Sequence, residues 1–175
     1  MKITTGIPEF ELRFAEITDC GLILQFITEL AEYERLAHEV VATIPVLEET
    51  LFGARRNTEV LIGEYQGAPV AYALYFHNFS TFTGRPGIYL EDLYVKPAMR
   101  GQGFGKSLLS YIASLAVARK CTRFEWSVLD WNEPSIEFYR SIGAVAMDEW
   151  TVQRLHGKAL HDFAAQFEHQ SFAKP

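Results

Sequence analysis

The segment Arg100-Gly101-Gln102-Gly103-Phe104-Gly105-Lys106 stands between an expected strand, residues 88–95, and the clearest amphipathic helix of the chain, residues 103–119. Because glycine has no Cβ, the backbone N–H groups of such a turn can point toward one position. The N-terminus of the helix adds unpaired donors and a partial positive charge. The segment therefore predicts an anion site suited to a phosphate or pyrophosphate, the alternative being a tight connection without a ligand.

The spacing of the glycines excludes two common phosphate-binding loops. The segment runs into Gly-Lys-Ser as a Walker loop does, but position 100, where the first glycine must stand, is Arg100. A dinucleotide fingerprint needs a third glycine at position 106, which is Lys106. Neither signature describes this turn.

Hydrophobic periodicity outward from the turn predicts a mixed α/β chain. Strands are expected at 11–16, 60–65, 70–76, 88–95 and 122–128, and helices at about 19–36, 45–52, 103–119 and 132–140, followed by further extended segments. Three successive strands before the third helix argue against a doubly wound parallel sheet. We expect a single domain over residues 1–175, with loose ends at 1–10 and 170–175.

Composition limits the possible partners. The chain has 175 residues, 49% of them hydrophobic, and a net charge of −6, with Arg55–Arg56 as its only basic cluster. Such a chain can bury one sizeable core and has no basic stripe for nucleic acid. No run approaches the ~18 apolar residues of a membrane span. Cys20 and Cys121, far apart and without metal-ligand spacing, predict a cytoplasmic protein, and the five histidines predict no metal site.

The pattern R/Q-x-x-G-x-G/A fits residues 100–105 and resembles the coenzyme A pyrophosphate loop of the GCN5-related N-acetyltransferase (GNAT) superfamily. About 30 residues on, Asn132-Glu133-Pro134-Ser135-Ile136-Glu137-Phe138-Tyr139 with Gly143-Ala144 is similar to a second motif of that superfamily. The resemblance implies a largely antiparallel mixed sheet of about six or seven strands with helices on both faces.

A closer resemblance is to the diamine (spermidine/spermine and thialysine) acetyltransferase subfamily. It rests on residues 29–34 (Glu-Leu-Ala-Glu-Tyr-Glu), 89–92 (Tyr-Leu-Glu-Asp) and 131–139 (Trp-Asn-Glu-Pro-Ser-Ile-Glu-Phe-Tyr). It implies acetyl-coenzyme A as cosubstrate and direct transfer, in a ternary complex, to a polyamine, a diamine or a thialysine-like amino acid. It also implies a homodimer.

The resemblance assigns the cofactor contacts to three segments. They are the strand residues Leu93, Tyr94 and Val95, the turn residues Arg100, Gly101, Gln102, Gly103, Phe104, Gly105 and Lys106, and the helix start Asn132, Glu133, Pro134 and Ser135. The backbone of the first segment would lie along the pantetheine arm and supply an oxyanion donor. From the pattern alone, Asn132 is a helix N-cap, which is compatible with a cofactor contact.

Acetyl transfer to an amine needs a neutral nucleophile, and an alkylamine of pKa near 10.4 is roughly one part in two thousand neutral at pH 7. Glu91 and Asp92 stand together in an otherwise apolar strand, where neighbours point to opposite faces. They are either a solvated strand end or acids at a cleft. The resemblance favours Glu91 as water-mediated base and substrate contact, with Asp92 as a helper.

Tyr139, Tyr33 and Glu34 each have a structural and a functional interpretation, and Cys121 bears on the route of transfer. Tyr139 is a packed aromatic by pattern, whereas the resemblance makes it the acid that protonates the coenzyme A thiolate. By pattern Tyr33 is one of the apolar residues at helical spacing and Glu34 is part of a solvated helix face, whereas the resemblance makes both of them amine contacts. Cys121 has no base in reach apart from Lys120, which argues against an acetyl-cysteine intermediate.

Two other functions stay open at this point. One is acetylation of a protein, peptide or antibiotic amine. The other is a non-catalytic regulator that binds coenzyme A, against which the presence of Glu91 and Tyr139 argues.

Overall fold

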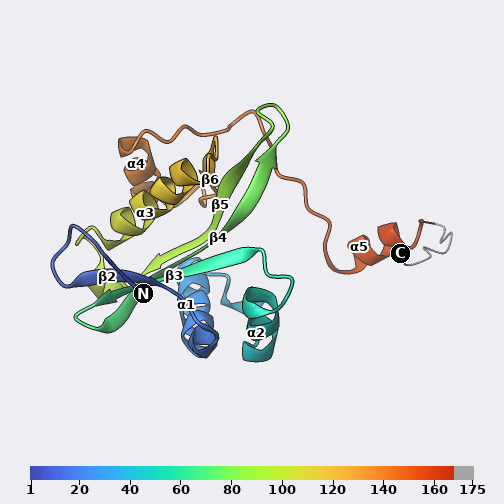
Figure 1. Ribbon diagram of the computed structural model, residues 1–175. Helices are drawn as coiled ribbons and strands as arrows, with labels where there is room; N and C mark the ends of the chain where they lie inside the picture. Colours follow the sequence, from blue (N-terminus) through green and yellow to red (C-terminus); the bar gives the residue numbers. More distant parts are fainter. Residues whose placement is uncertain (168–175) are drawn as a thin grey trace. The chain divides into compact units, whose positions relative to one another are not determined.

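The computed structural model describes residues 1–167, so the predicted loose end at 170–175 lies outside the described residues. The contacts divide the chain into two compact units, Met1–Ser127 and the residues from Val128 onward. The first unit is built on one six-stranded sheet in the order β1 to β6 (Figure 1). Its strands are β1 (Lys2–Thr4), β2 (Phe10–Phe14), β3 (Thr58–Tyr65), β4 (Ala68–Ser80), β5 (Arg85–Val95) and β6 (Phe124–Trp126).

The sheet is mixed and largely antiparallel, as predicted. The pairs from β1–β2 to β4–β5 are antiparallel, and only β5–β6 is parallel. The helix between β5 and β6 explains the exception, because parallel neighbours need a crossover connection.

Strand β1 departs from the expectation of a loose end at residues 1–10. Lys2–Thr4 pair with Glu11–Arg13 of β2. The Lys2 ammonium lies 2.7 Å from a Glu11 carboxylate oxygen and 3.3 Å from one of Glu64, which ties the segment to β2 and β3. Three residues are too short for a period-two pattern to be recognised in the sequence.

Helices cover both faces of this sheet (Figure 1). α1 (Cys20–Tyr33) and α2 (Ile44–Phe52) lie on one face and α3 (Phe104–Ala118) on the other. Short 3-10 turns η1 (Ile17–Asp19), η2 (Ala37–Glu39) and η3 (Pro97–Met99) complete the unit. The predicted helices and their order are confirmed to within a few residues.

Aromatic rings join each helical layer to the sheet. On the α1 face, Phe26 stacks on Tyr72 with ring centroids 5.3 Å apart and lies 5.9 Å from the ring of Tyr94. On the α3 face, Phe104 stacks on Phe10 at 4.1 Å. Phe104 is the first residue of α3, so this contact anchors the glycine-rich turn that precedes it.

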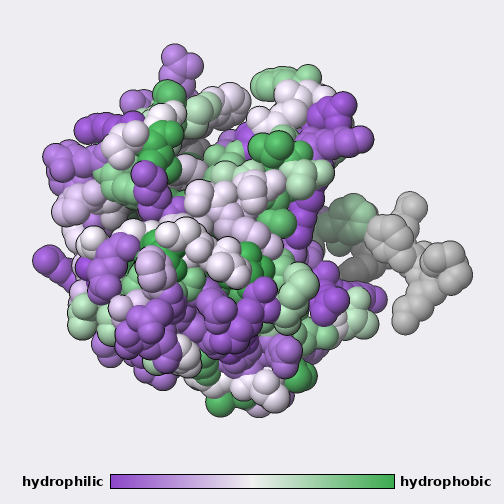
Figure 2. Space-filling model, turned by 60° about the vertical axis from the view of Figure 1, so that its left-hand side comes forward, coloured by the Kyte–Doolittle hydropathy of each residue, from purple (hydrophilic) through white to green (hydrophobic). Residues whose placement is uncertain are grey.

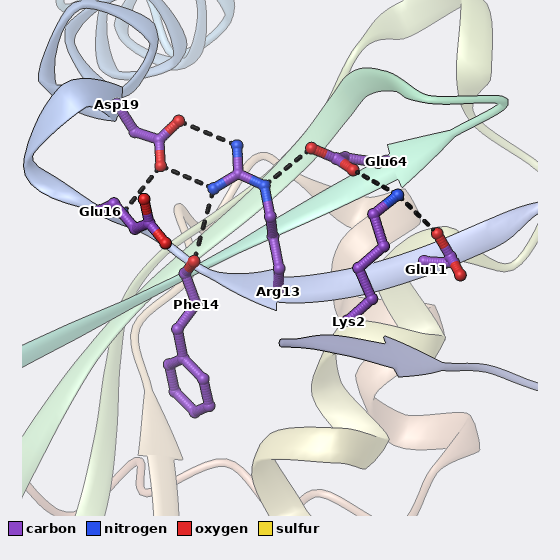
Figure 3. A network of polar contacts seen from close by, with 7 residues as sticks. All are labelled: Lys2, Glu11, Arg13, Phe14, Glu16, Asp19 and Glu64. Atoms are coloured by element: carbon purple, nitrogen blue, oxygen red, sulfur yellow. Dashed lines mark hydrogen bonds and ion pairs between the residues drawn. The ribbon is translucent and has the colours of Figure 1, made fainter.

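A polar network fixes the start of α1 to the sheet (Figure 3). The Arg13 guanidinium lies between two carboxylates, donating to Asp19 at 2.6 and 2.9 Å and to Glu64 at 2.7 Å. Asp19 occupies the N-cap position of α1, but its side chain accepts from Arg13 and from the Glu16 backbone N–H. The ion pair therefore holds β2, β3 and the α1 start together.

The second unit contains α4 (Glu133–Ser141) and α5 (Gly157–Ala164). The prediction of extended segments after Gly143 is wrong for the described residues, which contain no strand beyond Trp126. α5 was not predicted. It is only two turns long, with Leu160 and Phe163 as its large hydrophobic residues and a Lys158–Asp162 ion pair one turn apart.

Among residues 1–167, no helix is both long enough and apolar enough to span a bilayer. On the face shown in Figure 2, hydrophobic residues occur in small groups among hydrophilic ones.

Candidate functional site

The glycine-rich turn has the backbone that its sequence predicts. Gly101 and Gly103 have φ of 78° and 84°, in the left-handed region that a side chain disfavours. Gly103 is the N-cap of α3, and its carbonyl accepts from Ser107 N–H at 2.9 Å. Gly101, Gln102, Gly103 and Lys106 are exposed, whereas Phe104 is buried. The result is an open turn at the start of a four-turn helix, which fits a pyrophosphate.

The last part of β5 has one free edge among the described strands. β6 pairs only with Ile88–Leu90, whereas β4 continues beside β5 as far as Val95. Leu93, Tyr94 and Val95 therefore have a strand neighbour on one side, and Lys96 N–H donates to Val70 at 2.9 Å. A free edge beside the turn leaves backbone donors and acceptors for an extended ligand arm.

A β-bulge lies at the predicted catalytic strand. Asp92 is opposite Leu74 and Leu90 is opposite Tyr75, so Glu91 is the extra residue of β5. A bulge interrupts the alternation of side chains. The regular alternation from which Glu91 and Asp92 are expected on opposite faces is therefore interrupted at this position. Glu91 is exposed and Asp92 is half-buried.

The negative charges of three predicted acids act on one buried phenol. The Tyr72 hydroxyl donates to Asp92 Oδ2 at 2.6 Å. Burial, followed by the negative charges of Asp92, Glu34 and Glu91, raises the pKa of Tyr72 well above its ordinary value. Glu34, at the end of α1, thus lies within electrostatic range of Tyr72 and of Asp92 in β5.

Two of these acids are held partly out of water. Burial raises the pKa of Asp92, with the Tyr72 hydrogen bond opposing the shift. Burial and then the neighbouring Asp92 charge raise the pKa of Glu34. Carboxyls whose ionised form is disfavoured in this way gain from a nearby cation, so the cluster suits an ammonium ligand.

Tyr72 was not predicted from the sequence. It stands in the apolar run Val70-Ala71-Tyr72-Ala73-Leu74 and is buried, so its pattern is that of a core aromatic. The one available signal is that a buried tyrosine hydroxyl needs a hydrogen-bond partner. The sequence does not say which residue that partner is.

Arg100 connects the turn to the end of α1. Its Nε donates to the Val95 carbonyl at 3.0 Å, and its guanidinium carbon lies 4.4 Å from the ring centroid of Tyr33 and 5.9 Å from that of Tyr94. Burial, with a hydrogen bond to Glu29, raises the pKa of Tyr94 to about 12. A predicted cofactor residue and a predicted amine residue are therefore in contact.

The remaining predicted residues belong to the second unit. Asn132 is buried and occupies the N-cap position of α4, where its carbonyl accepts from Ser135 N–H at 3.1 Å and Ile136 N–H at 3.0 Å. Glu133 and Pro134 are exposed in the first turn. Tyr139 is half-buried, with its ring 5.6 Å from that of Phe138.

No group of three or more histidine, cysteine, aspartate or glutamate side chains with metal-binding geometry occurs within residues 1–167. The cysteines of this part of the chain are both free, with Cys20 buried and Cys121 half-buried.

Known proteins match both the sequence and the fold. Residues 25–144 match the model of the acetyltransferase (GNAT) family. The thialysine N-epsilon-acetyltransferase of Sus scrofa is 39% identical over 166 residues, which cover 89% of this chain and 97% of that protein. The L-ornithine N5-acetyltransferase NATA1 of Arabidopsis thaliana is 30% identical, with 85% of each chain covered. An integron cassette protein from the V. cholerae mobile metagenome has the same fold, with a TM-score of 0.76 at 24% identity, covering 89% of this chain and 98% of its own.

This chain belongs to the acetyltransferase (GNAT) family. It is an N-acetyltransferase, and membership of the family implies acetyl-coenzyme A as its cosubstrate. The open turn of Gly101 and Gly103 and the free edge of β5 fit that cosubstrate.

Proposed function

We propose that the protein transfers the acetyl group of acetyl-coenzyme A to a primary amine of a small polycation or amino acid: a polyamine, a diamine or a thialysine-like amino acid. The observation that supports this acceptor class is the hydrogen bond of Asp92 with the Tyr72 hydroxyl, together with the negative charges of Glu34 and Glu91 that act on the same hydroxyl. Carboxyls whose charges act on one place favour a ligand with more than one positive charge. The relatives named for thialysine and L-ornithine are consistent with this class.

The amine must lose a proton before it attacks. Glu91 is exposed at the bulge of β5, where a water molecule can lie between its carboxylate and the incoming ammonium. Asp92 and Glu34 are less exposed and bind positive charge instead of accepting the transferred proton. This division gives Glu91 the role of water-mediated general base.

Acetyl-coenzyme A supplies the activated acyl group when bound. The turn of Gly101, Gly103 and Gly105 binds its pyrophosphate with backbone N–H groups, together with exposed Lys106. The free edge of Leu93–Val95 binds the extended arm and donates a backbone N–H where negative charge develops. Asn132 and its neighbours in α4 contribute further contacts, and the Tyr139 hydroxyl donates the proton that the departing thiolate needs.

The transfer is direct, within a ternary complex. A covalent acetyl-cysteine needs a thiolate, and burial, followed by the charges of Glu48 and Asp19, raises the pKa of the Cys20 thiol. Cys121 lies in the connection from α3 to β6, where the sequence offers no base beside it apart from Lys120. Free thiols also suit a cytoplasmic protein.

We further propose a homodimer. The second unit exposes a series of large hydrophobic side chains that a partner copy can cover: Val145, Met147, Trp150, Val152 and Leu155. Sedimentation of the purified chain tests this, and a monomer at all concentrations would contradict it.

A panel of amines tests the proposed function. The protein is incubated with acetyl-coenzyme A and, separately, spermidine, 1,4-diaminobutane, thialysine, ornithine, a monoamine, a peptide amine and an aminoglycoside, and thiol release is followed. Release fastest with a diamine, polyamine or thialysine supports the proposal. Preference for the peptide or aminoglycoside contradicts the acceptor class, and no release despite tight coenzyme A binding leaves a regulator.

A further inference from the structure

The geometry points to Tyr72 as a positioning residue for acceptor recognition: its hydroxyl fixes the Asp92 carboxylate so that the free oxygen binds the non-reacting cationic group of the amine. This inference rests on the proposed function and deepens it. It assigns the discrimination between dications and monocations to a side chain that the acceptor does not touch.

The Tyr72 ring is buried and stacked on Phe26. It has 0% relative exposure, its ring is within 7° of parallel to that of Phe26, and in the ladder it is opposite Tyr94. A phenol packed in this way cannot follow a moving carboxylate. Its hydrogen bond of 2.6 Å therefore holds the Asp92 carboxylate in one orientation.

Asp92 needs such a fixed partner because of its place in the strand. It follows the bulge at Glu91, where the regular ladder is interrupted. The hydrogen bond occupies Oδ2 and leaves Oδ1 to accept from a ligand. Without the hydroxyl, the carboxylate can rotate toward solvent and the site loses its defined acceptor.

The surrounding charges favour a second cation. The titratable groups acting on the Tyr72 hydroxyl are Asp92, Glu34 and Glu91, and Asp92 also acts on Glu34. The nearby cations lie over neighbouring rings: Lys96 is 5.5 Å from the Phe26 centroid and Arg100 is 5.9 Å from that of Tyr94. Glu29 contributes to the raised pKa of Tyr94. A monoamine brings one positive charge to these three carboxyls, whereas a diamine brings two.

Tyr75 provides a matched control on the same strand. It also has 0% relative exposure, and its hydroxyl also donates to a carboxylate, that of Glu59 at 3.3 Å. Glu59 is paired with Arg119 and is not among the predicted site residues. Tyr75→Phe thus reproduces the chemistry of Tyr72→Phe without affecting Asp92.

The test compares KM and kcat for a diamine and a monoamine of equal chain length. Tyr72→Phe should raise the diamine KM about tenfold, as expected for loss of a hydrogen bond to a charged group, and leave kcat and the monoamine KM within about twofold. Tyr75→Phe should change neither KM. In an Asp92→Asn background, Tyr72→Phe should have no further effect, because it acts through that carboxylate.

The pH dependence gives a readout that a purely structural role would not change. The hydrogen bond stabilises ionised Asp92, so this carboxyl should protonate at a higher pH in Tyr72→Phe. The increase of the diamine KM on acidification should therefore begin at a higher pH in the variant than in wild type. Equal KM changes for diamine and monoamine, or independent effects of Tyr72→Phe and Asp92→Asn, overturn the inference.

Two further outcomes are separable. If the wild-type protein acetylates no amine, the proposed function fails, and calorimetric binding of 1,4-diaminobutane to wild type and Tyr72→Phe still decides the role of Tyr72. If Tyr72→Phe does not fold, a carbon-13 titration of the wild-type protein with the diamine replaces it. The Tyr72 ring carbon bearing the hydroxyl must then shift together with the Asp92 carboxyl, and an unchanged Tyr72 signal contradicts the inference.

Discussion

The guanidinium of Arg100 lies 4.4 Å from the ring centroid of Tyr33, so the turn proposed to bind the cofactor rests on the helix end proposed to bind the amine. Arg100 also donates to the Val95 carbonyl, which fixes it to the end of β5. One side chain therefore joins three segments of the first unit. A change at Arg100 should affect both substrates of the enzyme.

Arg100→Ala should raise KM for acetyl-coenzyme A and for the amine together, each by about three- to tenfold, within the range of a partly exposed cation–π contact. Steady-state kinetics with either substrate varied measures this. Arg55→Ala removes an equal charge from an exposed position and should change neither KM. An effect of Arg100→Ala confined to acetyl-coenzyme A would mean that the Tyr33 contact has no role in amine binding.

Glu91→Gln should lower kcat/KM at neutral pH by about a hundredfold, the usual contribution of a positioned general base. As the pH approaches the amine pKa of about 10.4, more of the amine is neutral and the deficit should shrink. Rates from pH 6 to 10 measure this. The control, Glu49→Gln, changes an exposed glutamate of α2 and should show no deficit. A deficit of constant size at every pH would argue for a binding role of Glu91 alone.

Tyr139→Phe tests the proposed acid. It should lower kcat about a hundredfold and leave the affinity for coenzyme A nearly unchanged, because the ring stays in α4 and only the hydroxyl is lost. Turnover and calorimetric binding of coenzyme A give the two quantities. Tyr111→Phe, in α3, serves as the control for loss of a half-buried hydroxyl. An unchanged kcat in Tyr139→Phe removes Tyr139 from the mechanism.

Local patterns predicted much of the first unit, and long-range pairing accounts for what they missed. The turn from Gly101 to Gly105 and the helix after it are local features, so their sequence determines them closely. The bulge at Glu91 depends on the register of β4 against β5, which no short window contains. Tyr72 and Asp92 are 20 residues apart and meet only through that register. The acids were therefore predictable, whereas the residue that holds one of them was not.

Asp92→Asn should stabilise the protein near neutral pH. Burial raises the pKa of Asp92 in the folded state above its ordinary 3.8, so ionisation of this group favours the unfolded chain. The stability that the protonated Asp92 carboxyl contributes is fully present below about pH 3.8. It is lost as the pH rises through the folded-state pKa of this group. Asparagine avoids that loss and can still accept from Tyr72.

The unfolding temperature of Asp92→Asn should accordingly be about 3 °C above that of wild type at pH 7, for a gain on the order of 1 kcal/mol in the free energy of unfolding. Below about pH 4 the two unfolding temperatures should be equal. Activity with a diamine should fall in the same variant. A lower unfolding temperature at pH 7 would show that the Asp92 charge supports the fold instead of the site.

Asp19→Asn should lower the stability of the protein at neutral pH, the opposite of the effect expected for Asp92→Asn. The hydrogen bonds from Arg13 lower the pKa of Asp19, so this carboxylate stabilises the fold above its unfolded pKa of 3.8, and the contribution is lost as the pH falls through the folded-state value. At pH 7 the variant should unfold about 5 °C below wild type, for a loss of roughly 2 kcal/mol typical of charge-assisted hydrogen bonds. The difference should disappear in strong acid.

The control, Asp162→Asn, breaks the exposed pair with Lys158 in α5 and should shift the unfolding temperature by less than about 1 °C. Since Arg13 joins β2, β3 and the α1 start (Figure 3), a loss as small as that of Asp162→Asn would mean that this network does not stabilise the fold.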